Sequence, residues 1–178
     1  MFALFSLPNP LHPALVHFPI VLLLLGAVVA IVAVFTRRWH LPIAAAILFF
    51  TGAIGTVVAV QTGEREGELT NETPALEQAL DQHEEWAERT QVAAIIAGLL
   101  ALAVVVTTRW PLVARGLGIA TAAGALAASW CVIETGHYGG HLVYSHAAGV
   151  NVVPADATGS LTDNSTVKGK KNHRDNDD

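Results

Sequence analysis

LVHFPIVLLLLGAVVAIVAVF, at residues 15–35, contains no Asp, Glu, Lys or Arg, and this stretch decides the fold class. A helix of about 20 apolar residues crosses roughly 30 Å of hydrocarbon. Three further uncharged stretches of similar length follow at Pro42–Gln61, Thr90–Thr108 and Leu112–Ile133. Together with Leu15–Phe35 they predict four transmembrane helices.

The distribution of charge supports the same interpretation. Apolar residues make up 52% of the chain and charged residues 14%, where soluble domains have about a quarter. Within residues 1–63 and 90–155 the charged side chains are few: Arg37, Arg38, Arg109, Arg115 and Glu134. A soluble domain could not cover its surface with so few charges, so the sequence predicts an integral membrane protein in a lipid bilayer.

The connections between the spans predict the topology. The links Thr36–Leu41 and Arg109–Pro111 are so short that the helices they join must be antiparallel neighbours. Thr73-Pro74 has the form of a helix cap followed by a first helical residue, so the third helix is expected to begin outside the membrane. One face of that extension is apolar and the other acidic: Leu76, Ala79, Leu80, His83, Ala87 and Thr90 against Glu77, Asp81, Glu84, Glu85 and Glu88.

The predicted fold is therefore all-α: an antiparallel four-helix transmembrane bundle in which the third helix carries an amphipathic outward extension. Residues 1–150 form the membrane domain. Residues 151–178 are rich in Asp, Asn, Ser, Thr, Lys and Gly and are expected to be a disordered polar tail.

Basic residues in short loops predict orientation, because cytoplasmic loops carry an excess of Lys and Arg. The two short links and their margins hold Arg37, Arg38, Arg109 and Arg115. We therefore expect a multi-pass protein of the bacterial inner membrane, with both termini and the acidic 62–89 loop on the periplasmic side.

Several site types are excluded by residue counts. Cys131 is the single cysteine, so neither an intramolecular disulfide nor a covalent c-type haem, which needs C-x-x-C-H, is available. Met1 is the single methionine, which excludes a thioether copper(I) site. No basic stripe with interleaved aromatics indicates nucleic-acid binding. No nucleophile–base pair, phosphate loop or carboxylate dyad indicates catalysis.

Histidines gather on the outward side of the predicted bundle. His17, His83 and His137 lie at or above the outer ends of the first, third and fourth spans, and we expect them to converge as the functional core. His146 is expected to support them as a ligand or hydrogen-bond donor. The remaining histidines are expected to matter less (His12 and His141) or to be dispensable (His40 and His173). Taken singly, each histidine is more simply explained as an interfacial polar residue than as a ligand, and it is their clustering on one side that makes a site an equal alternative.

Two local features bear on that choice. His12 and His17 are five residues apart, about 140° around a helix, so both can face one site only if the chain bends, and Pro19 can supply a bend. Gly139-Gly140 is expected to end the fourth helix between His137 and His141.

The motifs HPALVHFPI at 12–20, TGEREGE at 62–68, HEEWAE at 83–88 and TGHYGGHLVYSHAAGV at 135–150 resemble an uncharacterised bacterial membrane family. This family is known as domain of unknown function twenty-two thirty-one, a four-helix predicted membrane protein. The resemblance covers about residues 8–150. Ala147 stands where a glycine is common in the family, and His141 where Glu or Lys is common.

That family is similar to four-helix b-type cytochromes in helix count and histidine placement, and the resemblance implies haem b. Two axial imidazoles from facing helices would hold the iron. Gly136, Gly139 and Gly140 would let the backbone approach the macrocycle. The propionates would meet Tyr144, Thr135 or Arg89.

Three functions follow as hypotheses. The first is a small membrane cytochrome that passes electrons between a quinone or respiratory partner and an outward-facing acceptor. The second is a zinc or copper site for metal handling or sensing, built from His17, His83, His137 and Glu84. The third is a cofactor-free structural or assembly subunit, and a homo-oligomer is compatible with each of the three.

Overall fold

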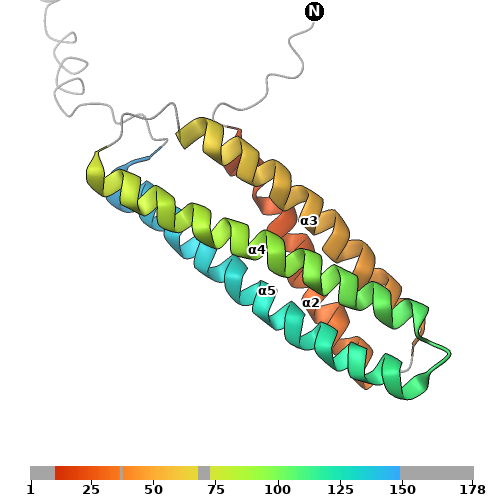
Figure 1. Ribbon diagram of the computed structural model, residues 1–178. Helices are drawn as coiled ribbons and strands as arrows, with labels where there is room; N and C mark the ends of the chain where they lie inside the picture. Colours follow the sequence, from red (N-terminus) through yellow and green to blue (C-terminus); the bar gives the residue numbers. More distant parts are fainter. Residues whose placement is uncertain (1–10, 37, 68–72, 149–178) are drawn as a thin grey trace, which may run out of the picture.

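The computed structural model describes residues 11–36, 38–67 and 73–148, and its described elements are all helices. Figure 1 shows them in chain order: α1 (His12–Leu15), α2 (His17–Phe35), α3 (His40–Gly67), α4 (Pro74–Val106) and α5 (Pro111–His146). α1 and α2 form one helical run with a turn at Val16, so the described chain holds four long helices. The tail predicted at 151–178 lies outside the described residues.

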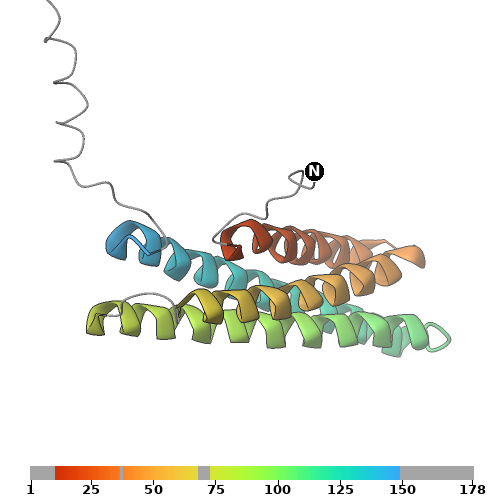
Figure 2. The same cartoon turned by 90° about the horizontal axis from the view of Figure 1, so that it is seen from above.

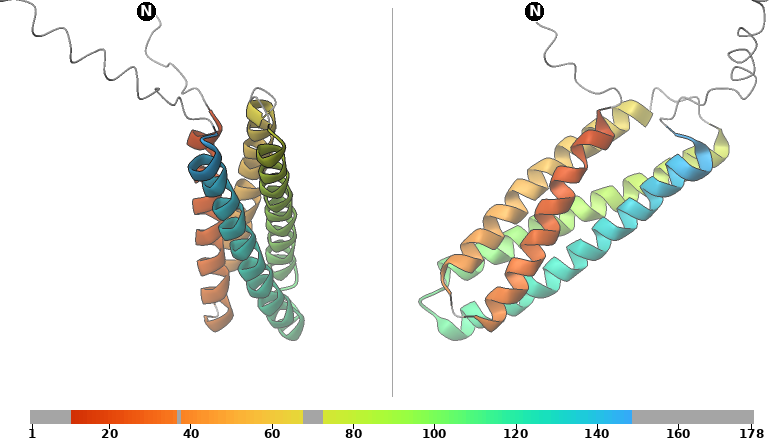
Figure 3. Two further views of the ribbon diagram at one scale, coloured as in Figure 1. Left: turned by 90° about the vertical axis from the view of Figure 1, so that its left-hand side faces the viewer. Right: turned by 180° about the vertical axis from the view of Figure 1, so that it is seen from behind.

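The four long helices pack as an antiparallel ring. α2 contacts α3, α3 contacts α4, α4 contacts α5, and α5 returns to α2, as the two views of Figure 3 show. The links 36–39 and 107–110 lie together at one end, which we name the arginine end after Arg38, Arg109 and Arg115. The opposite end, which holds α1, the end of α3, the start of α4 and the end of α5, is named the histidine end. The predicted up-and-down topology is confirmed.

The surface of the bundle is apolar along its length. All four helical runs are long and apolar enough to cross a membrane, and large side chains in their middle portions are exposed, among them Val21, Ile47, Ile96 and Leu126. Viewed from above, the long helices run in roughly the same direction (Figure 2). An exposed apolar face of this size is a lipid-facing surface, which confirms a multi-pass membrane protein.

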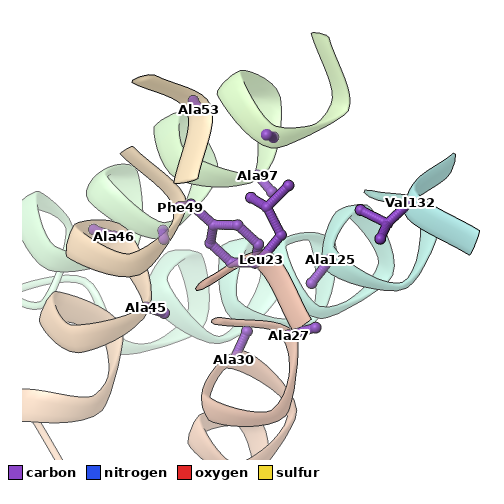
Figure 4. Close-up of a cluster of buried hydrophobic side chains, with 12 residues drawn as sticks. Leu23, Ala27, Ala30, Ala45, Ala46, Phe49, Ala53, Ala97, Ala125 and Val132 are labelled. Atoms are coloured by element: carbon purple, nitrogen blue, oxygen red, sulfur yellow. The ribbon is translucent and has the colours of Figure 1, made fainter. Parts of the chain in front are cut away.

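Small side chains fill the interior. Alanines line most helix contacts, and Phe49 and Leu23 are the largest fully buried side chains, at 0% and 1% exposure (Figure 4). Phe49 packs against glycines of two neighbouring helices: a Cβ atom added to Gly26 would lie 3.3 Å from its ring, and one added to Gly98 would lie 3.3 Å from its Cβ atom. In lipid, where burial from water gives no driving force between helices, such close packing holds the bundle together.

The amphipathic extension of the third helix is present as predicted. Thr73 caps α4, because its side chain accepts a hydrogen bond from the amide of Leu76, and Pro74 is the first helical residue. Leu76 and Ala79 are buried against Leu142 of α5. The acidic residues that alternate with them are exposed: Glu77, Asp81, Glu84, Glu85 and Glu88.

The expected end of the fourth helix at Gly139-Gly140 is wrong, because α5 continues to His146. Gly139 instead lies in close contact with α4, where an added Cβ atom would lie 3.1 Å from the His83 ring. The helix ends at Ala147, whose φ of 51° is left-handed, and the next amide, of Ala148, donates to the carbonyl of Leu142. Packing against the α4 extension thus carries α5 past two glycines that would end an isolated helix.

Candidate functional site: a histidine pair between two hairpins

Two imidazole rings meet at the histidine end. His12 begins α1 and His83 lies in the α4 extension, and their ring centroids are 6.2 Å apart with an interplanar angle of 89°. Both side chains are half-buried. They come from the two hairpins of the bundle: His12 belongs to the hairpin of α1, α2 and α3 and packs on α3, and His83 belongs to the hairpin of α4 and α5 and packs on α5.

α5 holds the ring of His83. Its Nδ1 atom lies 3.1 Å from the carbonyl oxygen of Thr135, and a Cβ atom on Gly139 would lie 3.1 Å from its Cε1 atom. The hydroxyls of Thr90 and Thr135 form a hydrogen bond of 2.9 Å just below, which ties α4 to α5 beside the accepting carbonyl. The His83 ring is therefore held between the carbonyl of Thr135 and the backbone of α5 at Gly139, which has no side chain.

α3 holds His12 in the same way. Its Nδ1 atom lies 2.8 Å from the carbonyl oxygen of Ala59, and a Cβ atom on Gly63 would lie 3.0 Å from its Cε1 atom. The carboxylate of Glu66 accepts the backbone amides of Leu11 and His12 at 2.6 and 2.9 Å. These contacts fix the start of the first helical run to the end of α3.

The two halves repeat one arrangement. In each, a histidine contacts a carbonyl and a glycine four residues further along the next helix: Ala59 with Gly63, and Thr135 with Gly139. Because a carbonyl oxygen only accepts, Nδ1 carries the proton in both rings, and the lone pair of the neutral imidazole is on Nε2. Nε2 is also the ring nitrogen farther from each glycine. The Nε2 atoms of His12 and His83 are thus directed away from the helices that hold the rings.

Burial affects the charge of His83. The α4 extension lies outside the apolar span, yet the bundle end desolvates this ring, and desolvation lowers its pKa below the usual 6.5. The hydrogen bond to Thr135 opposes that shift, and the neighbouring His12 adds to it. His83 is therefore neutral at pH 7, which is the protonation state that binds metals.

The structure does not bring His17 and His137 to this pair, although the sequence led us to expect them there. His17 is exposed, and its Nδ1 atom lies 2.8 Å from the carbonyl of Pro13 in its own helical run. The turn at Val16 separates it from His12, and Pro19 accounts for that turn because it has no amide for the carbonyl of Leu15. His137 is exposed on α5, where its ring contacts Tyr138.

The other predicted site residues lie further along α4 and α5. The ring of His146 is 5.3 Å from that of His141, centroid to centroid. Tyr144 is 92% exposed, and a Cβ atom on Gly140 would meet open space. Arg89 pairs with Glu85 and lies over the ring of Trp86. Of the residues expected in the site, the structure places His83 beside His12, and Thr135 and Gly139 against the ring of His83.

From sequence, His12 is expected to matter less than His17 and His137, because it precedes the first span and is followed by a proline. The structure places it beside His83. The pattern that identifies it is the pairing of motifs, since HPALVHFPI and TGEREGE hold His12 and Gly63, and HEEWAE and TGHYGGHLVYSHAAGV hold His83 and Gly139. Four motifs that are distant in sequence thus meet as two matched histidine–glycine contacts.

Comparison with known proteins gives one match. A family model described as "Predicted membrane protein (DUF2231)" covers residues 8–152, which include all four motifs and all four long helices. A search of curated proteins finds no match. A search of solved structures finds none either.

Proposed function

The chain belongs to the DUF2231 family of predicted membrane proteins, and we propose that it binds haem b between His12 and His83 and transfers electrons. The observation that carries the proposal is the histidine pair: two imidazoles from opposite hairpins, each held through Nδ1 by a carbonyl, with centroids 6.2 Å apart.

The separation of the rings favours haem over a bare metal ion. For metal–nitrogen bonds of about 2.0–2.1 Å, two imidazoles on opposite sides of one metal have centroids about 6 Å apart, and two at a tetrahedral angle about 5 Å. The separation of 6.2 Å is close to the first value, so His12 and His83 would be the residues that hold the haem iron. The number of histidines in the pair also agrees with haem, because haem iron requires only two protein ligands. Among residues 11–36, 38–67 and 73–148, no group of three His, Cys, Asp or Glu is placed to hold a metal ion.

The surrounding residues have defined roles in this proposal. The carbonyls of Ala59 and Thr135 orient the two rings and raise the basicity of Nε2, as carbonyls that accept a hydrogen bond from a metal-bound histidine do. Gly63 and Gly139 leave room for the rings against the helices. Glu66 holds His12 in place through its backbone amide. Haem, when bound, supplies one-electron chemistry.

We place the site at the periplasmic face of a bacterial inner membrane. The arginine end carries Arg38, Arg109 and Arg115 and is the cytoplasmic end by the distribution of basic residues. A site at the opposite end would exchange electrons with a quinone or a respiratory partner in the membrane and with an acceptor outside it.

A transition-metal site for zinc or copper is the second candidate. The observation that favours it is the pair His141 and His146, whose centroid separation of 5.3 Å suits two ligands at a tetrahedral angle. Such a site would need further ligands from a partner or a second copy, since the described residues place no third donor there.

Haem and metal content of detergent-purified variants tests the proposal. We expect wild-type protein to contain haem, His12→Ala and His83→Ala to lose it, and His17→Ala and His137→Ala to keep it. The last two are matched controls because both histidines are exposed at the same end. His83→Gln, which retains a donor for Thr135, separates ligand loss from misfolding. Zinc or copper without haem would favour the second candidate, and wild-type protein with neither would favour a cofactor-free subunit.

A further inference from the structure

A second site is suggested by the opposite end of the molecule. At the arginine end, a cavity of about 620 Å³ lies between all four long helices, within the range of roughly 300–1,000 Å³ that is usual for small-molecule sites. Its walls are small apolar residues, which include Ala30 of α2, Ala45 of α3, Ala101 of α4 and Gly118 of α5. The four helices pack less closely here than at Phe49.

The mouth of the cavity is cationic. Arg38 and Arg115 line it from the start of α3 and the start of α5, and both side chains are exposed. The sequence has no Asp or Glu within residues 1–63 or 90–133, so the ends of all four helices around this mouth offer no carboxylate. An anion for the two guanidinium groups must therefore come from outside the bundle.

The position of the cavity in the bilayer indicates what that anion is attached to. Trp39 lines the cavity and is exposed, and Trp110, directly before α5, is exposed as well; such tryptophans are typical of the headgroup level. The deepest lining residue on α5, Thr121, is ten residues beyond Pro111, about 15 Å at 1.5 Å per residue. That depth is about one leaflet of a hydrocarbon core of roughly 30 Å.

We propose that this cavity binds an anionic glycerophospholipid, with an acyl chain among the alanines and the phosphate between Arg38 and Arg115. Basic pockets between transmembrane helices bind anionic headgroups in this manner. The site is at the far end from the histidine pair and uses none of its residues, so it stands independently of haem binding.

Native mass spectrometry of delipidated protein tests the site, with phosphatidylglycerol and phosphatidylcholine of identical acyl chains as probes. We expect preferential retention of phosphatidylglycerol. Each of Arg38→Gln and Arg115→Gln should lower its retention about fivefold, and the double variant roughly 25-fold. Arg109→Gln is the matched control, since Arg109 is at the same end but does not line the cavity.

The apolar part of the site has its own matched pair. A Cβ atom added at Gly118 or at Gly116 meets no neighbour within 4 Å, so the two glycines are matched positions for substitution by leucine. Gly118 lines the cavity and Gly116 does not. Gly118→Leu should lower retention of the lipid, while Gly116→Leu should not.

Three results would overturn the proposal: equal retention of the two lipids, equal effects of the variants and their controls, or full competition by glycerol 3-phosphate. The last result would mean that the phosphate alone is recognised. Elution volume and helical circular dichroism, measured on every variant, ensure that a loss of lipid is not a loss of fold.

Discussion

The imidazole rings of His12 and His83 meet edge to face at a centroid distance of 6.2 Å, although the two residues belong to opposite hairpins of the bundle. Each ring is bound through Nδ1 to a carbonyl on the next helix. The orientation of each ring is thus set by a different helix, α3 or α5, and the distance between them by how the two hairpins pack. Substitutions that move either hairpin should therefore change the site without touching a histidine.

The contact between Gly139 and His83 can be tested by adding a single methyl group. Gly139→Ala places a Cβ atom 3.1 Å from the His83 ring, whereas Gly140→Ala meets open space. Alanine at position 140 should gain up to about 1 kcal/mol from helix propensity. Overpacking at position 139 should leave that variant about 1–3 kcal/mol less stable than Gly140→Ala. Thermal unfolding in detergent measures the difference, and equal stabilities would show that the ring is not clamped.

Acidification should destabilise the folded protein through His83. Its pKa is lowered in the folded state, so the unfolded chain takes up a proton near pH 6.5 while the folded chain does not. This contribution is absent above pH 6.5 and reduces stability as the pH falls below it, because the unfolded state then binds more protons. The melting temperature of cofactor-free wild-type protein should fall more between pH 7.5 and 5.5 than that of His83→Gln. Parallel pH profiles for the two proteins would exclude this role of His83.

The left-handed residue at the end of α5 offers a stabilising substitution. Ala147 has a φ of 51°, which costs a residue with a Cβ atom about 1 kcal/mol relative to glycine. Ala147→Gly should therefore raise stability by about 1 kcal/mol. Ser145→Gly, two residues earlier inside the helix, should lower it by a similar amount. If both substitutions destabilise the protein, the chain does not leave the helix at Ala147.

Membrane orientation can be measured with single cysteines in a Cys131→Ala background. Arg109→Cys lies at the arginine end and Ser145→Cys at the histidine end, and both positions are exposed. A membrane-impermeant maleimide added to intact cells should label position 145, and position 109 only after the cells are opened. Labelling of both from the same side would contradict the four-span topology.

The fold could be predicted from sequence because membrane insertion leaves few options. Four uncharged stretches with short links at 36–41 and 109–111 allow little besides antiparallel helices, and the face containing Leu76, Ala79 and His83 follows from helical spacing alone. In the structure Leu76 and Ala79 of that face are buried against Leu142 of α5.

The composition of the histidine pair could not be predicted in the same way. Spacing shows that His12 and His17 point in different directions, but only the contacts of His12 with Ala59 and Gly63 of α3 show which of them faces inward. The sequence predicted a helix end at Gly139 because local helix propensity takes no account of the His83 ring, which packs against Gly139 from α4. Both errors concern long-range contacts, which override local preference.

The absorption spectrum of detergent-purified wild-type protein, recorded oxidised and then reduced, tests the central claim most directly. Haem held by His12 and His83 predicts the spectrum of a six-coordinate, low-spin b-type cytochrome in both states, lost in His83→Gln and retained in His17→Ala. A colourless wild-type protein purified from cells supplied with haem, with helical content and elution volume as expected for the folded bundle, would contradict it.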